Sequence, residues 1–130
     1  MIVVDASVLV PALADDGHDG DRARGRLRGE RLAAPEIIDL EVASVLRRQA
    51  ANGQIDERRC VLALRDLVAL PLRRAAHRPL LPRCWELRHD LTIYDGAYVA
   101  LAEALGALLL TADIRLSHAV GPRCQMEILT

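Results

Sequence analysis

The chain has 130 residues, of which 52% are hydrophobic and 27% are charged, and 17 basic against 18 acidic residues leave a net charge of -1. This length and composition allow a single domain, residues 1–130, to bury a sizeable core, which excludes wholesale disorder and makes a disulfide or metal scaffold unnecessary. The longest nearly apolar stretch, residues 97–112, is shorter than the roughly 20 residues that cross a bilayer. Residues 1–5 have no basic segment and include an acid, so we do not expect them to act as a secretory signal. We therefore expect a cytoplasmic protein with no membrane partner.

The first third of the chain is predicted to alternate between strands and helices. A β-branched run at Ile2–Val4 predicts a strand, and residues 7–14 predict a short helix. Residues 15–21 (DDGHDGD) have the acidic, glycine-containing composition of a loop, and residues 22–29 favour one or two further helical turns. Residues 32–34, which precede a proline, predict a second strand.

The middle of the chain carries recognisable helix boundaries. Residues 36–52 predict a long helix that Gly53 ends as its C-cap, and Asp56 is expected to cap a helix that extends to about Ala69. Residues 70–72 contain a proline, which is tolerated at the edge of a sheet but not in its centre, so they favour an edge strand.

The last third continues the alternation. In chain order, we expect a helix over residues 79–89, a strongly periodic helix at Ile93–Leu105 followed by Gly106, a strand buried on both faces over residues 107–111, a short helix over residues 113–120 and a final strand over residues 126–129. Strands that alternate with helices indicate a parallel sheet with helices on both faces, so the predicted fold class is α/β.

Three aspartates are predicted to meet at one edge of this sheet. Asp5 directly follows the first strand, and Asp113 lies just past the strand over residues 107–111. The helix that begins near Asp95 rises about as far as the following strand returns, roughly 16 Å each way, so Asp95 and Asp113 are expected at the same edge. Ligands of parallel sheets bind outside the carboxyl ends of the strands, which makes this edge the first candidate for a site.

A fourth acid, Glu41, lies on the apolar face of its predicted helix. Its neighbours one turn away are Ile37, Ile38, Ser44 and Val45. An unpaired carboxylate buried there would be costly, so Glu41 is expected to share the edge with the aspartates. Converging carboxylates raise one another's pKa unless a cation neutralises them, and a set of oxygen ligands favours Mg²⁺ or Mn²⁺ over zinc.

Each acid also has an ordinary structural explanation. Asp5, Asp95 and Asp113, taken singly, are typical of helix N-caps or first turns. Glu41 has the alternatives of pairing with Arg48 or extending to solvent. Independent caps need not converge on one edge, so the joint spacing favours a site.

Four segments in register resemble a known family. They are residues 2–10 (IVVDASVLV), residues 41–48 (EVASVLRR) in the helix that follows Pro35, residues 91–102 (LTIYDGAYVALA) and residues 109–113 (LLTAD). Together they resemble the PIN-domain ribonucleases, and their order, their spacing and the chain length are similar to the VapC toxins of bacterial toxin–antitoxin pairs. The resemblance covers nearly the whole chain and implies a PIN-like three-layer α/β/α sandwich around a mainly parallel sheet of four to five strands.

The resemblance also implies an activity and its residues. It implies a Mg²⁺-dependent endoribonuclease toxin, with Mn²⁺ able to substitute, that cleaves RNA with metal-activated water and is neutralised by a cognate VapB-like antitoxin. The catalytic and metal-binding acids carry over as Asp5, Glu41, Asp95 and Asp113, with Ser7 and Thr111 at the family's small hydroxyl positions. Gly96 stands where the family often has alanine. The alternative is a catalytically silent PIN scaffold that binds RNA or a partner protein.

Apolar and basic surfaces are further candidates for partner binding. Some apolar side chains of the helices are expected to stay exposed and to support a homodimer or hold the antitoxin, among Val8, Val10, Leu13, Leu46, Val61, Leu64 and Leu67. The arginines at positions 22, 24, 26, 28 and 31 fit either a grip on RNA phosphate or a solvated helix face that offsets the acidic residues 15–21. Trp85, Tyr94 and Tyr98 are too few for a base-stacking platform and are expected in the core or an interface.

Overall fold

Five short strands form one sheet at the centre of the molecule, in the order β3-β2-β1-β4-β5, and every neighbouring pair is parallel. The computed structural model describes residues 1–130. Its elements in chain order are β1 Ile2–Val4, α1 Ala6–Ala14, α2 His18–Leu27, β2 Leu32–Pro35, α3 Ile38–Ala51, α4 Glu57–Ala69, β3 Leu72–Ala75, a 3-10 helix at Arg78–Leu80, α5 Leu81–Glu86, α6 Ile93–Leu105, β4 Leu108–Thr111, α7 Ile114–Ser117 and β5 Met126–Ile128. The inner strands β1, β2 and β4 are buried along most of their length, as expected of parallel strands covered on both faces.

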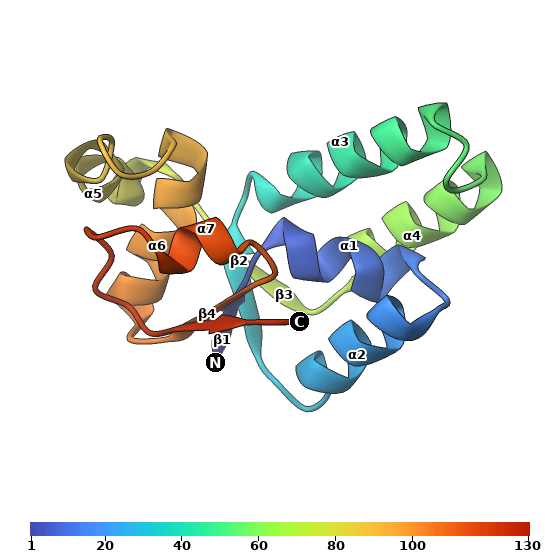
Figure 1. The fold of residues 1–130 in the computed structure, drawn as a ribbon, viewed down its shortest axis with the longest axis horizontal. Coiled ribbons are helices and arrows are strands. Elements are labelled where there is room, and N and C mark those ends of the chain that lie inside the picture. The colour runs from blue at the N-terminus through green and yellow to red at the C-terminus, as the bar shows by residue number, and fades with distance from the viewer.

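Helices cover both faces of the sheet. α6 packs on β1, β2 and β4 and carries α5, whereas α1 packs on β4 from the other side and contacts α2, α3 and α4. Figure 1 shows the sheet between these two groups, with α5, α6 and α7 on the left and α1 to α4 on the right. This three-layer arrangement around five parallel strands confirms the predicted fold class.

The predicted caps Asp56 and Gly106 are confirmed, whereas α3 is Ile38–Ala51 and its C-cap is Asn52, one residue before the predicted Gly53. Asp56 accepts a hydrogen bond from the Arg59 backbone N–H (2.7 Å) at the start of α4. Gly53 and Gly106 follow α3 and α6 with positive φ angles of 73° and 59°. A residue with a Cβ adopts such angles at a cost, so glycine is suited to end both helices.

The prediction that residues 15–21 form one loop is wrong, because α2 begins within them at His18. Two aspartates of this segment lie in the first turn of α2, where the free backbone N–H groups favour negative charge. Gly20 permits the tight approach of this turn to the preceding chain, because a Cβ there would come within 1.7 Å of the Asp15 carbonyl oxygen. The acidic composition therefore marks a helix start as well as a short loop.

Other predicted elements exist but are displaced at their ends. The edge strand expected over residues 70–72 is β3, Leu72–Ala75, which pairs Leu72 with Leu32 and leaves Pro71, with no N–H to donate, outside the strand. The helix expected over residues 79–89 is divided into the 3-10 turn and α5. The short helix expected over residues 113–120 ends at Ser117.

The core joins both helical layers to the sheet in a cluster of 28 buried residues. Tyr98 of α6 is the largest of its fully buried side chains, which confirms the core assignment for this aromatic residue. Trp85 and Tyr94 lie instead on the surface, at 62% and 61% exposure. The Arg88 guanidinium stacks on the Trp85 ring, 4.3 Å from its centroid.

The expectation of exposed apolar side chains on α1, α3 and α4 is correct only in part. Of the residues named for it, Val61 is exposed, whereas Val8, Val10, Leu46 and Leu67 are buried. The exposed apolar surface of α3 and α4 consists of Leu40, Val61, Leu62 and Val68.

None of the helices combines the length and the apolar character that are needed to span a bilayer.

Candidate active site

The predicted acids lie at the carboxyl edge of the sheet, near the ends of the neighbouring strands β1 and β4. From β1 the chain adds β2 and β3 on one side of the sheet, and it then returns to add β4 and β5 on the other side. Asp5 follows β1, and its backbone N–H donates to the Leu110 carbonyl of β4 (3.0 Å). Such a switch point is where ligands bind in open parallel sheets.

Asp5 occupies the N-cap position of α1, but its carboxylate makes no capping hydrogen bond. Its Oδ2 instead accepts hydrogen bonds from Ser7 Oγ (2.5 Å) and Thr111 Oγ1 (2.9 Å). Ser7 Oγ also accepts from the Ala112 N–H (2.9 Å), and Thr111 Oγ1 accepts from the Asp113 N–H (3.0 Å). The two hydroxyls therefore connect Asp5 to the turn that positions Asp113, and the capping alternative does not explain the Asp5 side chain.

Glu41 lies in the first turn of α3 and is half-buried. The Tyr98 hydroxyl donates to its Oε1 (2.5 Å), and no hydrogen bond or ion pair joins Glu41 to Arg48. Burial raises the pKa of Glu41 above its ordinary value, and the charges of Asp5 and Asp95 raise it further against the effect of the Tyr98 hydrogen bond. Burial and Glu41 in turn raise the pKa of Tyr98, which keeps the phenol protonated as a donor.

Asp95 lies in the first turn of α6 without serving as its N-cap. Thr92 has that role, because its Oγ1 accepts from the Asp95 backbone N–H (3.1 Å). Burial raises the pKa of Asp95, and Asp5 and Asp113 add to the increase through their charge. The next residue, Gly96, faces α5, and a Cβ there would lie 3.4 Å from Cys84 Cα, so α5 packs closely on the helix start.

Asp113 caps the short helix α7, as the structural alternative predicts, and its charge also acts on Asp95. Its Oδ1 accepts from the Arg115 backbone N–H (3.0 Å). The Arg115 guanidinium donates to Oδ1 (3.1 Å) and to Oδ2 (2.8 Å). These bonds hold the pKa of Asp113 below its ordinary value.

The four acids Asp5, Glu41, Asp95 and Asp113 are together called the acid cluster. The charges of Asp5 and Asp95 raise the pKa of Glu41, and the charges of Asp5 and Asp113 raise the pKa of Asp95. Carboxylate oxygens in such a shared negative field are ligands that Mg²⁺ and Mn²⁺ prefer. No three acidic, histidine or cysteine side chains lie close enough to hold a metal ion as they stand. The donor chemistry therefore fits a divalent cation, and joint coordination needs the side chains to rotate toward one point.

Two residues of this edge were not singled out by the sequence prediction of the site. Tyr98 lies one turn after Asp95 on α6, so helical periodicity places both on one side of the helix. That spacing could have indicated Tyr98, but its contact with Glu41 of α3 depends on how the two helices meet. Arg115, two residues after Asp113, is close enough in sequence to have been anticipated as a partner.

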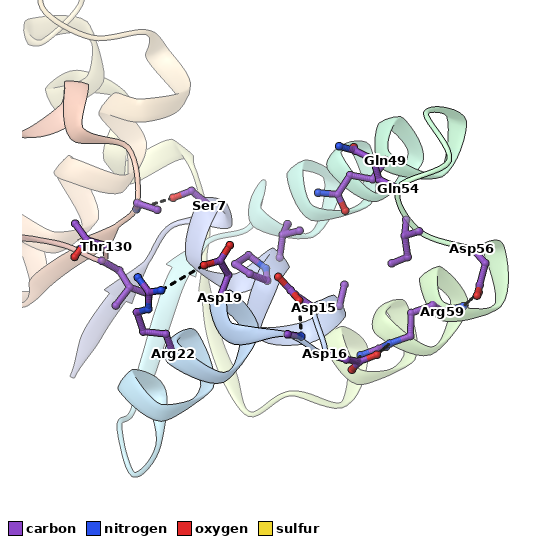
Figure 2. A pocket seen from close by; sticks show the side chains of 17 residues that line it. Ser7, Asp15, Asp16, Asp19, Arg22, Gln49, Gln54, Asp56, Arg59 and Thr130 are labelled. Atoms are coloured by element: carbon purple, nitrogen blue, oxygen red, sulfur yellow. Dashed lines mark hydrogen bonds and ion pairs between the residues drawn. The ribbon is translucent and has the colours of Figure 1, made fainter.

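A groove of ≈ 890 Å³ begins beside Ser7 and continues along α1 toward the ends of α3 and α4 (Figure 2). Its charged lining consists of Asp15, Asp16, Asp19, Asp56, Arg22 and Arg59. Both arginines are paired with aspartates of the groove, Arg22 with Asp19 (3.5 Å) and Arg59 with Asp16 (3.2 Å). The surface that leads to the acid cluster is therefore acidic.

The arginines between residues 22 and 31 are largely engaged within the chain. Three of them form ion pairs: Arg22 with Asp19 (3.5 Å), Arg24 with Asp21 (2.7 Å) and Arg26 with Glu127 (2.7 Å) and Glu30 (3.0 Å). These pairs support the alternative in which this helix offsets neighbouring acids.

Comparison with known proteins adds independent information. Residues 2–121 match the PIN domain family. The chain is 43% identical over 132 residues to Ribonuclease VapC9 of Mycobacterium tuberculosis, covering 99% of this chain and 98% of that one. It is 41% identical over 128 residues to Ribonuclease VapC1 of the same species, covering 98% and 96%. Among solved structures, VapBC2 from Rickettsia felis bound to a DNA fragment from their promoter has a TM-score of 0.71 at 16% identity, with 100% of each chain covered. This likeness is one of fold alone.

Proposed function

This chain belongs to the PIN-domain family and, within it, to the VapC ribonucleases, and we propose that it is an endoribonuclease toxin of a type II toxin–antitoxin system. In this proposal it cleaves RNA phosphodiesters in the cytoplasm with Mg²⁺ as its cofactor, for which Mn²⁺ can substitute. The observation that carries the proposal is the acid cluster at the carboxyl edge of the sheet, in which burial and neighbouring carboxylates raise the pKa of Glu41 and of Asp95.

The acid cluster provides the residues that would hold the cation: Asp5, Glu41, Asp95 and Asp113. When bound, Mg²⁺ supplies charge neutralisation at the phosphoryl oxygens and promotes attack by water. In this proposal the four carboxylates bind the cation and orient it. Their half-buried positions strengthen the electrostatic interactions made there.

Neighbouring hydroxyl groups keep two of these carboxylates in place. Ser7 and Thr111 both donate to Asp5 Oδ2, and Tyr98 donates to Glu41 Oε1. Groups that orient ligands in this way hold the side-chain geometry that metal binding and catalysis require. Ser7, Thr111 and Tyr98 are therefore assigned as positioning residues.

No histidine hydrogen-bonds to the acid cluster. His77 accepts from the Ile37 backbone N–H (3.0 Å), which places its ring beside the start of α3 rather than among the acids. A site without an imidazole base favours attack by water over attack by the ribose 2′-hydroxyl. We therefore expect products with 5′-phosphate and 3′-hydroxyl ends.

The direct test is to incubate the purified chain with total RNA in Mg²⁺, in Mn²⁺ or in excess EDTA, and to map the product ends. Cleavage in either metal, none in EDTA, and 5′-phosphate ends are the expected results. Products with 2′,3′-cyclic phosphate, or full activity in EDTA, would contradict the proposal. RNA that is bound in both metals but never cut would instead support the catalytically silent scaffold.

The expected protein partners are a VapB-like antitoxin and a second copy of the chain. The acidic groove beside Ser7 suits basic side chains of an antitoxin segment, and an arginine that reaches the acid cluster would compete with metal and substrate. The exposed apolar side chains of α3 and α4 offer additional contact area.

Light scattering at micromolar concentration tests whether the chain forms a dimer. Growth of cells that express the chain with and without the antitoxin encoded beside it tests neutralisation.

A further inference from the structure

Arg115 is an arginine whose side chain contacts the acid cluster directly. Its Nε and Nη2 donate to the two carboxylate oxygens of Asp113, at 3.1 and 2.8 Å. Two parallel bonds of this kind match the planar guanidinium to the planar carboxylate and engage both oxygens. The charge of Arg115 also reaches Asp95, where it opposes the increase in pKa caused by burial and by Asp5. Arg115 therefore acts as a counter-ion to part of the cluster.

This contact differs from the arginine pairs that hold the fold together. Arg83 bonds both oxygens of Glu103 and the carbonyl of Gly121, which joins three separate segments, and its side chain is 19% exposed. Arg115 binds a residue two positions away, makes no other side-chain hydrogen bond, and is 85% exposed. The cap of α7 uses the backbone N–H of Arg115, which any residue except proline supplies. The guanidinium is thus not needed for the fold.

A divalent cation that uses Asp113 has to compete with this guanidinium. Both oxygens of Asp113 are engaged, and an approaching cation also meets the like charge of Arg115. Arginine stays protonated at every pH at which the carboxylates are ionised, so the competition persists across that range. The exposed side chain can leave Asp113 without breaking any packing contact of the core.

We propose that Arg115 occupies Asp113 until a divalent cation displaces it, and that Arg115 thereby lowers the affinity of the acid cluster for metal. The competition rests on the metal-dependent site proposed above. It makes Arg115 a regulator of metal loading within the chain, because metal must reach a higher concentration to fill the site than the carboxylates alone would require.

The test is a titration with Mn²⁺, with free Mn²⁺ followed by electron paramagnetic resonance. The proteins are the wild type, Arg115→Ala and the control Arg28→Ala, which removes the same charge from the exposed end of α2 near the other edge of the sheet. Arg115→Ala is expected to bind Mn²⁺ about fivefold more tightly, which is the upper range for breaking an exposed ion pair. Arg28→Ala is expected to bind like the wild type.

Salt provides a second measure of the same competition. The difference in Mn²⁺ affinity between Arg115→Ala and the wild type should become smaller as NaCl is raised from about 0.02 M to about 0.5 M, because salt screens an exposed ion pair. Equal affinities in low salt, weaker binding by Arg115→Ala, or a difference that salt does not change would each overturn the proposal. If the wild type binds no Mn²⁺ at all, the metal-dependent function itself fails, and this outcome is distinct from failure of the competition.

Discussion

The acid cluster and the surroundings of Glu103 place partly buried carboxylates in opposite environments. Glu103 accepts two hydrogen bonds from Arg83 (2.7 and 3.2 Å) and one from the Arg123 backbone N–H (2.7 Å). Burial raises the pKa of Glu103, but these partners outweigh it and hold the pKa below its ordinary value of 4.5. Glu41 has a neutral donor, Tyr98, and burial together with neighbouring negative charges raises its pKa above the same value.

The difference shows which carboxylates serve the fold and which are available to a ligand. Ionised Glu103 stabilises the folded state because a cation of the chain is packed against it. Ionised Glu41 destabilises the folded state, because the chain concentrates like charges around it. Perturbed carboxylates of the second kind are typical of functional sites, where an external cation relieves the repulsion.

The largest effect is expected from Asp5→Asn, which removes a charge that acts on both Glu41 and Asp95. Cleavage of RNA should fall at least about 100-fold. The fold should persist, because asparagine has the same size and its carbonyl can still accept from Ser7 or Thr111. Initial rates on one RNA at saturating metal measure the effect, and Asp66→Asn, at an exposed aspartate of α4, provides a matched control. Wild-type cleavage by Asp5→Asn would place the site elsewhere.

On the other side of the comparison, Arg83→Ala should lower stability without altering the chemistry. It leaves Glu103 without its charged partner and removes the bond to the Gly121 carbonyl. The free energy of unfolding in urea should decrease by about 2 kcal/mol, whereas Arg115→Ala, which breaks one exposed ion pair, should change it much less. Cleavage per folded molecule should match the wild type. A stability unchanged by Arg83→Ala would remove the distinction between the two kinds of arginine pair.

Tyr98→Phe examines the neutral donor of Glu41 with the packing of the ring retained. Without the hydroxyl, Glu41 loses its hydrogen bond, and cleavage should decrease about tenfold, as is typical when a group that orients a metal ligand is removed. Tyr94→Phe, next to Asp95 but exposed, removes a hydroxyl that makes no such bond and should leave the rate unchanged. Equal rates for the two variants would show that Tyr98 only fills the core.

The smallest effects are pH-dependent changes in the free energy of unfolding, each below about 1 kcal/mol. They should have opposite signs at Glu41 and Glu103. In EDTA near pH 7, Glu41→Gln should be more stable than the wild type and Glu103→Gln less stable. The raised pKa of Glu41 means that its protonated form contributes stability that is present below pH 4.5 and is lost as the pH rises through the raised value. The lowered pKa of Glu103 means that its ionised form contributes stability that is lost as the pH falls below 4.5 through the lowered value.

Urea unfolding across this range measures both differences from the wild type. The Glu41→Gln difference should disappear as the pH falls toward 4.5, while the Glu103→Gln difference should disappear only at lower pH. Two differences of the same sign at pH 7 would contradict the contrast between the regions.

The sequence by itself determined the elements and the edge at which the acids lie. Strand runs, the capping residue Asp56 and the glycines after α3 and α6 are local signals, and local signals set element boundaries. The positions of Asp5 and Asp113 follow from the ends of β1 and β4, because parallel strands share a carboxyl edge. The acidic residues 15–21 misled the prediction, since the same composition suits a loop and the first turn of a helix.

Only the tertiary structure decided which partner each side chain meets. Periodicity shows that Glu41 and Tyr98 lie on inward faces of their helices, but their contact depends on how α3 and α6 meet across the sheet edge. The burial of Val8 and Leu46 and the exposure of Val68 depend in the same way on how α1, α3 and α4 pack against one another. The acidic groove is assembled from segments far apart in the chain. A helical pattern reports the apolar face of one element, whereas contacts, cavities and pKa values arise from the packing of several.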